Sequence, residues 1–245
     1  MKFEDWLNEI YTMKNGTKVT DSTVFKYVRA VNTISKEMNE EGLIDKSLES
    51  MELVELDLAI ELILNNQRFI DKDKTGHGMY SNALKKFRCY KYHNSNLELD
   101  ENEEEIKMSQ DKSIKPTERE ELIKSRRGQG EFRTQLMLKY NNQCIMTEIT
   151  VTKTLIASHI KPWAVCSNSE RLDVNNGLLL SATYDKLFDC GLITFDKKGK
   201  LKVSDFINDK NKELLNLKSG EIYDIKCSGN MEEYLKYHNE VIFVK

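Results

Sequence analysis

The sequence predicts an α+β protein with an all-helical N-terminal part and a mixed C-terminal part. Apolar residues recur at helical spacing through most of residues 1–95. A polar, acidic stretch with few apolar residues follows at 96–116. Beyond it, short apolar runs that suit strands alternate with helical patterns. We therefore expect a small helical domain at 1–95, an acidic linker at 96–116 and a second domain at 117–245.

The composition is that of an ordinary globular protein. The chain has 245 residues, of which 31% are charged, and its net charge is only -3. A length of this kind suits one large domain or two modest ones. Because the whole chain is not basic, any binding of nucleic acid has to depend on local basic clusters.

The cysteines and the N-terminal segment indicate the compartment. The five cysteines are scattered and form no C-x-x-C pair, which argues against a disulfide framework and against a zinc ribbon. The opening MKFEDWLNEI carries acids where a signal peptide has a basic segment, and no apolar run is long enough to cross a membrane. We expect a cytoplasmic protein with reduced thiols and no membrane association.

The N-terminal part predicts four helices. They are expected at 3–13, from 21 or 22 to Gly42, at 52–66 and at 79–92, and a loop is expected at 71–78. The last helix is the most basic, with Lys85, Lys86 and Arg88 beside an aromatic face. These cations either form a solvated surface over the core or contact DNA phosphates, and both interpretations stay open. The domain is expected to bind DNA or a partner.

A second basic cluster precedes the C-terminal strands. A helix with a capping-box pattern is expected to begin at Pro116-Thr117, and another follows within 126–144. The start of the second helix is flanked by glycines and carries Arg126, Arg127, Gln129 and Arg133. A helix N-terminus with arginines suits phosphate binding, although ordinary surface arginines give the same pattern.

The stretch from 144 to 200 carries the candidate chemistry. An apolar strand ends in Ser158-His159, a polar loop follows, and Asn176-Gly177 leads into a second strand at 178–180. A short helix near 184–188 and a hairpin come next. The remaining chain predicts a helix near 230–238 and a last strand at 241–244, packed on this core.

These residue types suit hydrolysis of a phosphodiester. The reaction needs a base for the attacking water and an electrophile for the phosphate oxygens. A neutral His159 is a base near pH 7. Asp185 and Asp189 are four apart on the helix, so both can face one hard cation. Asn176 can tie back the loop. Spacing alone leaves a structural role for the histidine as the commoner alternative.

The ordered motifs R-G-Q-G-E-F-R, L-I-A-S-H-I-K-P-W, N-N-G-L-L-L-S and Y-D-K-L-F-D-C-G-L-I-T-F-D add to this interpretation. Over about 125–205 the chain resembles HNH endonucleases of the ββα-metal fold, in particular the bacterial restriction-type branch with A-H-I-x-P-W, N-G-L-x-L and F-D-x-G segments. The resemblance implies that His159 is the general base and that Asn176 braces the loop. It also implies that Asp185 binds metal and that Asp189 is a second ligand.

The chain departs from that family at three places. Ser158 stands where many members carry an acidic or histidine metal ligand, so it is only a weak candidate, through its hydroxyl or through water. Tyr184 lies near the position of the last histidine of other members and is expected to pack or to contact phosphate. The paired zinc-binding cysteines of some members are absent. Lys161 is expected to join the basic residues that contact DNA.

The sequence therefore predicts an α+β endonuclease that uses Mg²⁺ or Mn²⁺. Double-stranded DNA is the expected substrate, and the expected products carry 5′-phosphate and 3′-hydroxyl ends. Restriction of foreign DNA by a homodimer is the favoured biology. Two alternatives stay open. One is a nonspecific or nicking defence nuclease, and the other is a non-catalytic DNA-binding protein that keeps the HNH scaffold.

Overall fold

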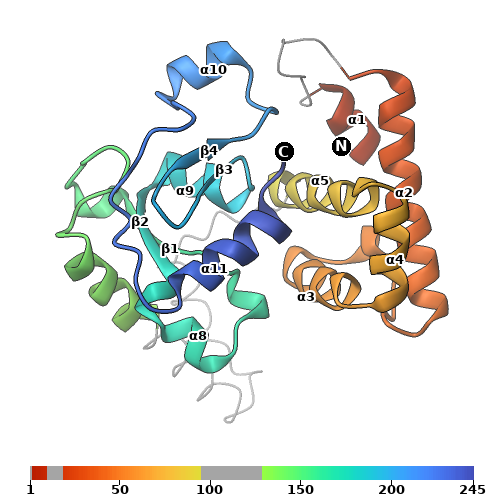
Figure 1. The fold of residues 1–245 in the computed structure, drawn as a ribbon, viewed down its shortest axis with the longest axis horizontal. Coiled ribbons are helices and arrows are strands. Elements are labelled where there is room, and N and C mark those ends of the chain that lie inside the picture. Colours follow the sequence, from red (N-terminus) through yellow and green to blue (C-terminus); the bar gives the residue numbers. More distant parts are fainter. Residues whose placement is uncertain (1, 10–18, 95–128) are drawn as a thin grey trace, which may run out of the picture.

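The computed structural model describes residues 2–9, 19–94 and 129–245. It has a helical lobe and a second lobe in which two antiparallel hairpins are combined with helices (Figure 1). The predicted α+β class is thus confirmed. The expected linker at 96–116, the helix start at Pro116-Thr117, and Arg126 and Arg127 lie outside the described residues.

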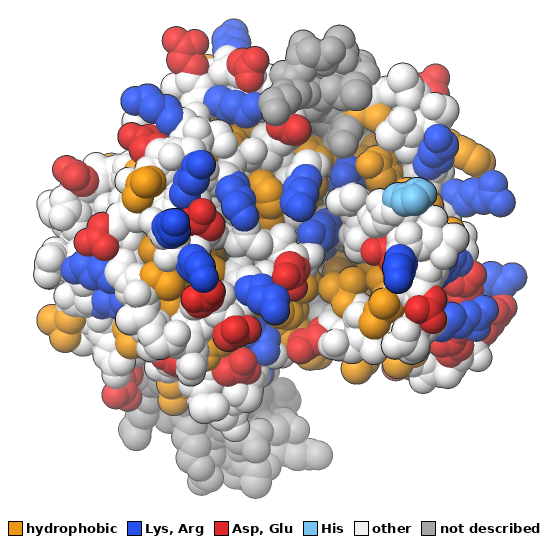
Figure 2. Space-filling view, in the orientation of Figure 1, with side chains coloured by type: hydrophobic (Ala, Val, Ile, Leu, Met, Phe, Trp, Pro, Cys, Tyr) orange, Lys and Arg blue, Asp and Glu red, His pale blue; other side chains and the backbone are white. Residues whose placement is uncertain are grey.

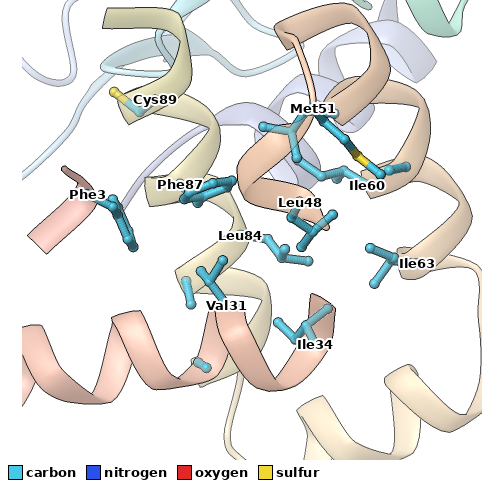
Figure 3. Packing of buried hydrophobic residues seen from close by; sticks show 14 of the residues in the cluster. Phe3, Val31, Ile34, Leu48, Met51, Ile60, Ile63, Leu84, Phe87 and Cys89 are labelled. Atoms are coloured by element: carbon cyan, nitrogen blue, oxygen red, sulfur yellow. The ribbon is translucent and has the colours of Figure 1, made fainter. Parts of the chain in front are cut away.

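The helical lobe is built around the last of its helices. Its elements are α1 (Phe3–Glu9), α2 (Asp21–Glu40), the short 3₁₀ helix at Leu48–Ser50, α3 (Leu53–Leu64), α4 (Gln67–Thr75) and α5 (Met79–Asn94). Figure 3 shows apolar side chains from these elements meeting around α5, among them Leu48, Leu84 and Phe87. Each side chain removed from water in such a core contributes about 1.5–3 kcal/mol, which fixes α5 among its neighbours.

The prediction of a loop at 71–78 is wrong, because helix α4 occupies most of this range. The helix begins after Asn66, whose side chain accepts a hydrogen bond from the main-chain nitrogen of Phe69. Phe69 is buried in the core, and Lys72 forms an ion pair with Glu37 of α2. One buried aromatic and a cap are enough to hold a helix whose other residues are mostly charged.

The second lobe is organised by a β-hairpin and the helix after it. Strand β1 (Leu155–His159) pairs antiparallel with β2 (Gly177–Ser181), and helix α9 (Ala182–Asp189) follows β2 directly. A second hairpin joins β3 (Ile193–Phe195) to β4 (Leu201–Val203). The other elements are a helix over 129–139, 3₁₀ turns at Thr152–Thr154, Trp163–Val165 and Val174–Asn176, and helices α8 (Asn168–Leu172), α10 (Asp209–Leu214) and α11 (Met231–Tyr237).

The prediction of a last strand at 241–244 is also wrong. After α11 the chain makes one π-helical stretch, His238–Ile242, and then runs back to the end of α9. There the main-chain nitrogen of Val244 donates to the oxygen of Gly191. The apolar run is buried, but Val244 packs in the core of the helical lobe. Across the described ranges, no helix is long and apolar enough to span a bilayer.

Candidate active site

The β1–β2 hairpin places Ser158 and His159 on opposite faces, because neighbouring strand residues alternate. His159 lies opposite Gly177, on the face covered by the helix at 129–139. A Cβ at Gly177 would lie only 2.5 Å from Phe132 and 2.6 Å from Leu136, so glycine is what lets this helix approach. Helix α9 lies on the other side of the hairpin (Figure 1), the side toward which Ser158 points.

The imidazole of His159 is held on three sides. Its ring stacks on Phe132 with centroids 4.0 Å apart, and Trp163 meets it edge-on at 5.5 Å. Its Nε2 lies 3.0 Å from the main-chain oxygen of Arg171. A carbonyl oxygen only accepts, so Nε2 carries the proton in the neutral ring and Nδ1 keeps its lone pair. The geometry thus presents Nδ1 as a proton acceptor.

Burial sets the protonation state of His159. Loss of water around the ring lowers its pKa below the usual range, and the hydrogen bond to Arg171 offsets only part of this effect. At neutral pH the ring is therefore uncharged. An uncharged imidazole of fixed tautomer is the form that general-base catalysis needs.

Asn176 ties down the loop between the strands. Its side chain is fully buried, and its Oδ1 accepts from the main-chain nitrogen of Lys161 at 2.8 Å. Its Nδ2 donates to the oxygen of Glu170 at 3.1 Å and to the sulfur of Cys166 at 3.2 Å. The loop that supplies the Arg171 carbonyl is thus fastened at both of its ends by one amide.

Helix α9 carries both aspartates on its buried side. Asp185 is 4% exposed, and the Asp189 carboxylate accepts a hydrogen bond from the Tyr92 hydroxyl at 3.0 Å. Burial, and next the nearby Asp185, raise the pKa of Asp189 to about 7, although Arg88 and the Tyr92 hydrogen bond act the other way. Two acidic groups thus lie near each other with little access to water, and a bound cation would favour their charged forms.

A divalent cation fits the donors present. Among the described residues there is no cluster of three or more His, Cys, Asp and Glu arranged to hold a metal. Mg²⁺ commonly needs only one or two carboxylates, because waters and substrate phosphates complete its shell. Ser158 adds a buried hydroxyl, 2% exposed and without a hydrogen-bond partner among the described residues. The residues that could hold the ion are Asp185, Asp189 and, more weakly, Ser158.

Several side chains expected on DNA are engaged within the protein instead. Arg88 is 5% exposed and forms a two-point ion pair with Asp57, at 2.6 and 3.1 Å. Lys86 is 1% exposed and lies 4.5 Å from the Tyr27 ring centroid and 5.0 Å from that of Phe206. In this arrangement neither cation reaches a phosphate, because partners distant in the sequence bury both.

The other side chains that were expected to contact DNA differ in their surroundings and partners. Burial lowers the pKa of Lys85, which is half-buried, to about 8. Arg133 donates to the main-chain oxygens of Leu155 and Thr152, so it supports the start of β1. Lys161 pairs with Glu170 at 3.1 Å. Gln129 is exposed at the described start of its helix and remains open to solvent.

Three contributors were not predicted as site residues. Phe132 belongs to the apolar face of the helix at 129–139 and carries no polar group that would mark it as a site residue, yet it stacks on the histidine. The helical pattern did not decide whether Tyr90 or Tyr92 faces the apolar side of α5, and the Tyr92 hydroxyl donates to the Asp189 carboxylate. Arg171 acts through its carbonyl, which no side-chain pattern can indicate. Tyr184 packs and donates to the oxygen of Leu215, as one of its two expected roles required.

The comparison with known families agrees with this geometry. Residues 144–196 match the family model described as HNH endonuclease. No curated protein matches the chain. The matched range contains both strands of the first hairpin, helix α9 and β3, and with them His159, Asn176 and the two aspartates. Residues 144–196 therefore form an HNH endonuclease domain, and this family suggests nuclease activity on DNA.

Proposed function

We propose that the protein is a metal-dependent endonuclease that cuts double-stranded DNA, with His159 as general base. The observation that carries the proposal is the contact of His159 Nε2 with the Arg171 oxygen, because it leaves Nδ1 as the acceptor. This base stands at the end of β1, and the adjoining helix α9 carries the buried carboxylate of Asp185 and the half-buried one of Asp189. Phosphodiester hydrolysis requires a base and an electrophile. We propose that His159, which faces the helix at 129–139, and the carboxylates of α9 on the other side of the hairpin supply them from the end of the same ββα unit.

In the proposed reaction His159 Nδ1 takes a proton from water, which attacks phosphorus in line with the 3′-oxygen. The P–O3′ bond breaks, its electron pair stays on the 3′-oxygen, and that oxygen takes a proton from solvent, leaving 5′-phosphate and 3′-hydroxyl ends. Phe132 and Trp163 exclude solvent from the ring and keep it oriented. Asn176 acts indirectly, since it holds the loop from which the Arg171 carbonyl points. A divalent cation bound by Asp185 and Asp189 would supply positive charge for the developing phosphate and leaving-group oxygens.

The DNA-contacting surface is expected around this site. On the face of the second lobe that Figure 2 shows, Lys and Arg are interspersed with acidic side chains and form no single uniform basic patch. Exposed cations close to the site in sequence include Lys153 before β1 and Lys186 between the two aspartates of α9. We propose that these two, with Gln129, contact phosphates. Arg126 and Arg127, which lie outside the described residues, remain proposed contacts as well.

Restriction of foreign DNA by a homodimer is the biological role we favour. One base per chain cuts one strand, so a double-strand break requires two chains or two successive nicks. A nonspecific or nicking defence nuclease is the alternative in the same class. A non-catalytic DNA-binding protein is the alternative outside it, and the presence of His159, Asn176 and Asp185 together in the HNH-like segment speaks for catalysis over that alternative.

Plasmid cleavage tests the proposal. Supercoiled DNA is incubated with the full-length protein and Mg²⁺ or Mn²⁺. Discrete fragments indicate restriction, a smear indicates nonspecific cutting, and accumulation of open circles indicates nicking. His159→Ala should reduce the rate by about 10²–10⁴-fold while DNA binding stays intact. His77→Ala, which changes an exposed histidine of the helical lobe, is the matched control. Cutting by His159→Ala at the normal rate would refute the base assignment.

A further inference from the structure

The interface between the two lobes meets the nuclease site at Asp189. Its carboxylate accepts from the Tyr92 hydroxyl at 3.0 Å, and its main-chain oxygen accepts from Arg88 Nη1 at 2.7 Å. Tyr92 and Arg88 are one turn apart on α5, the central helix of the other lobe. One residue of α9 is therefore held at its backbone and at its side chain by a single helix from outside the HNH domain.

The backbone contact completes the end of α9. Gly191 adopts φ +70°, and its nitrogen donates to the oxygen of Phe188 while that of Leu192 donates to Leu187. These two bonds form a Schellman motif, which leaves the Asp189 oxygen without a partner inside the helix. Arg88 supplies that partner as a cation at the helix C-terminus, where positive charge is favourable.

Arg88 is itself fixed from behind. Asp57 of α3 binds its guanidinium through both carboxylate oxygens, and both side chains are buried. A bidentate pair of this kind sets the plane and position of the guanidinium. The chain of contacts runs from α3 through Arg88 to the main chain of Asp189, with Tyr92 bonded to the carboxylate alongside. The helical lobe thus provides a rigid frame for one end of α9.

We propose that Tyr92 is a positioning residue for the nuclease, because it orients the Asp189 carboxylate. Arg88 contributes by holding the main chain of the same residue. The helical lobe thereby supplies the side chains that surround and orient a metal ligand. This inference rests on the proposed function, in which Asp189 binds the ion. Ligating carboxylates depend on hydrogen-bonded neighbours that orient them, and removal of such a neighbour typically costs about 10–100-fold in metal affinity or activity. Tyr92 has that relation to Asp189. The N-terminal helices are then part of the active site rather than a separate DNA-binding attachment.

The test compares Tyr92→Phe with Tyr90→Phe in the full-length protein. Tyr92→Phe keeps the ring and removes the donor to Asp189. Tyr90 lies on the same helix, in an aromatic cluster with Phe3, Trp6 and Phe87, and serves as the matched control. Calorimetric titration with Mn²⁺ alone measures binding, and plasmid cleavage over a range of Mg²⁺ concentrations measures use of the ion.

We expect Tyr92→Phe to weaken Mn²⁺ binding by about 10-fold and to raise the half-saturating Mg²⁺ concentration similarly. At saturating Mg²⁺ its turnover should approach that of the wild type, and Tyr90→Phe should change neither quantity. Equal Mn²⁺ affinity of wild type and Tyr92→Phe overturns the positioning role and leaves the proposed function standing. A wild-type protein that neither binds Mn²⁺ nor cuts DNA overturns the proposed function and this inference together.

Discussion

The Nε2 atom of His159 lies 3.0 Å from the main-chain oxygen of Arg171, so the proton of the neutral ring is fixed on that side. A backbone carbonyl from a loop thus decides which nitrogen can accept a proton from water. Neither residue alone shows this chemistry, because it depends on the loop returning to the end of β1.

The pH dependence of cleavage follows from the same histidine. Burial lowers the pKa of His159 below the ordinary 6.5, and only the neutral ring can act as base. At saturating metal, kcat/KM should therefore rise with pH on the acid side and level off above a midpoint below about 6.5. Initial rates between pH 4.5 and 8.5 measure this. A midpoint clearly above 7 would contradict a neutral, buried base.

Asn176→Ala should lower turnover more than stability. The substitution removes the amide that binds Lys161 and Glu170, and so frees the loop that presents the Arg171 carbonyl. A displacement of about 1 Å at a catalytic group can cost about 10²-fold in rate. Steady-state cleavage and urea unfolding measure the two effects separately. The neighbouring Asn175→Ala is the control, and equal losses in both variants would argue against a bracing role specific to Asn176.

Gly177→Ala should destabilise the second lobe. Its backbone is extended, so the new methyl group causes no backbone strain, but it would lie 2.5 Å from Phe132 and 2.6 Å from Leu136. Overpacking of a filled core costs about 1–3 kcal/mol. Because Phe132 also stacks on His159, activity should fall as well. Gly130→Ala is the control. Gly130 lies in the helix that carries Phe132 and Leu136, and an added methyl group there would point into open space, so this substitution should be neutral or stabilising.

His238 should make the fold sensitive to acid. Burial lowers its pKa to about 3, while Nε2 bonds to the Phe188 oxygen and Nδ1 to the Thr194 hydroxyl. Between the folded and unfolded pKa values only the unfolded chain binds the proton, so stability falls as pH falls below about 6.5. From pH 6.5 to 5.5 the loss is about 1 kcal/mol. In urea unfolding, His238→Gln should remove this part of the pH dependence; an unchanged slope would contradict it.

Much of the fold could be predicted because its signals are local. Helix α2 has a clear apolar face, α3 and α5 are long runs with a high share of apolar or aromatic residues and no proline, and β2 of the first hairpin begins at the turn residue Gly177. The signal failed where burial is decided elsewhere. In α4, charged residues obscure the single buried aromatic, Phe69. The apolar run before Val244 is buried without forming a strand, so its composition could not reveal its conformation.

In the candidate site too, residues with local sequence signals could be predicted, and those whose surroundings come from distant parts of the chain could not. His159, Asn176 and the aspartates stand in ordered motifs, and the structure places the four on the first hairpin and its helix. The basic residues were harder to interpret, because a lysine or arginine has the same appearance in sequence whether solvent or protein surrounds it. Lys86 is buried by Phe206, which is far along the chain, and Arg88 by Asp57. Such long-range pairings have no local signature.

The position of Val244 has a consequence for synthesis. The helices of the first lobe are translated before the segment that contains β1 and α9, but the core of that lobe includes Val244, which also bonds to Gly191 just beyond α9. The helices translated first thus gain their final packing only after the nuclease segment has been made. A chain that stops before Val244 lacks both contacts, so its helical lobe loses one buried side chain and the residue just beyond α9 loses one backbone hydrogen bond.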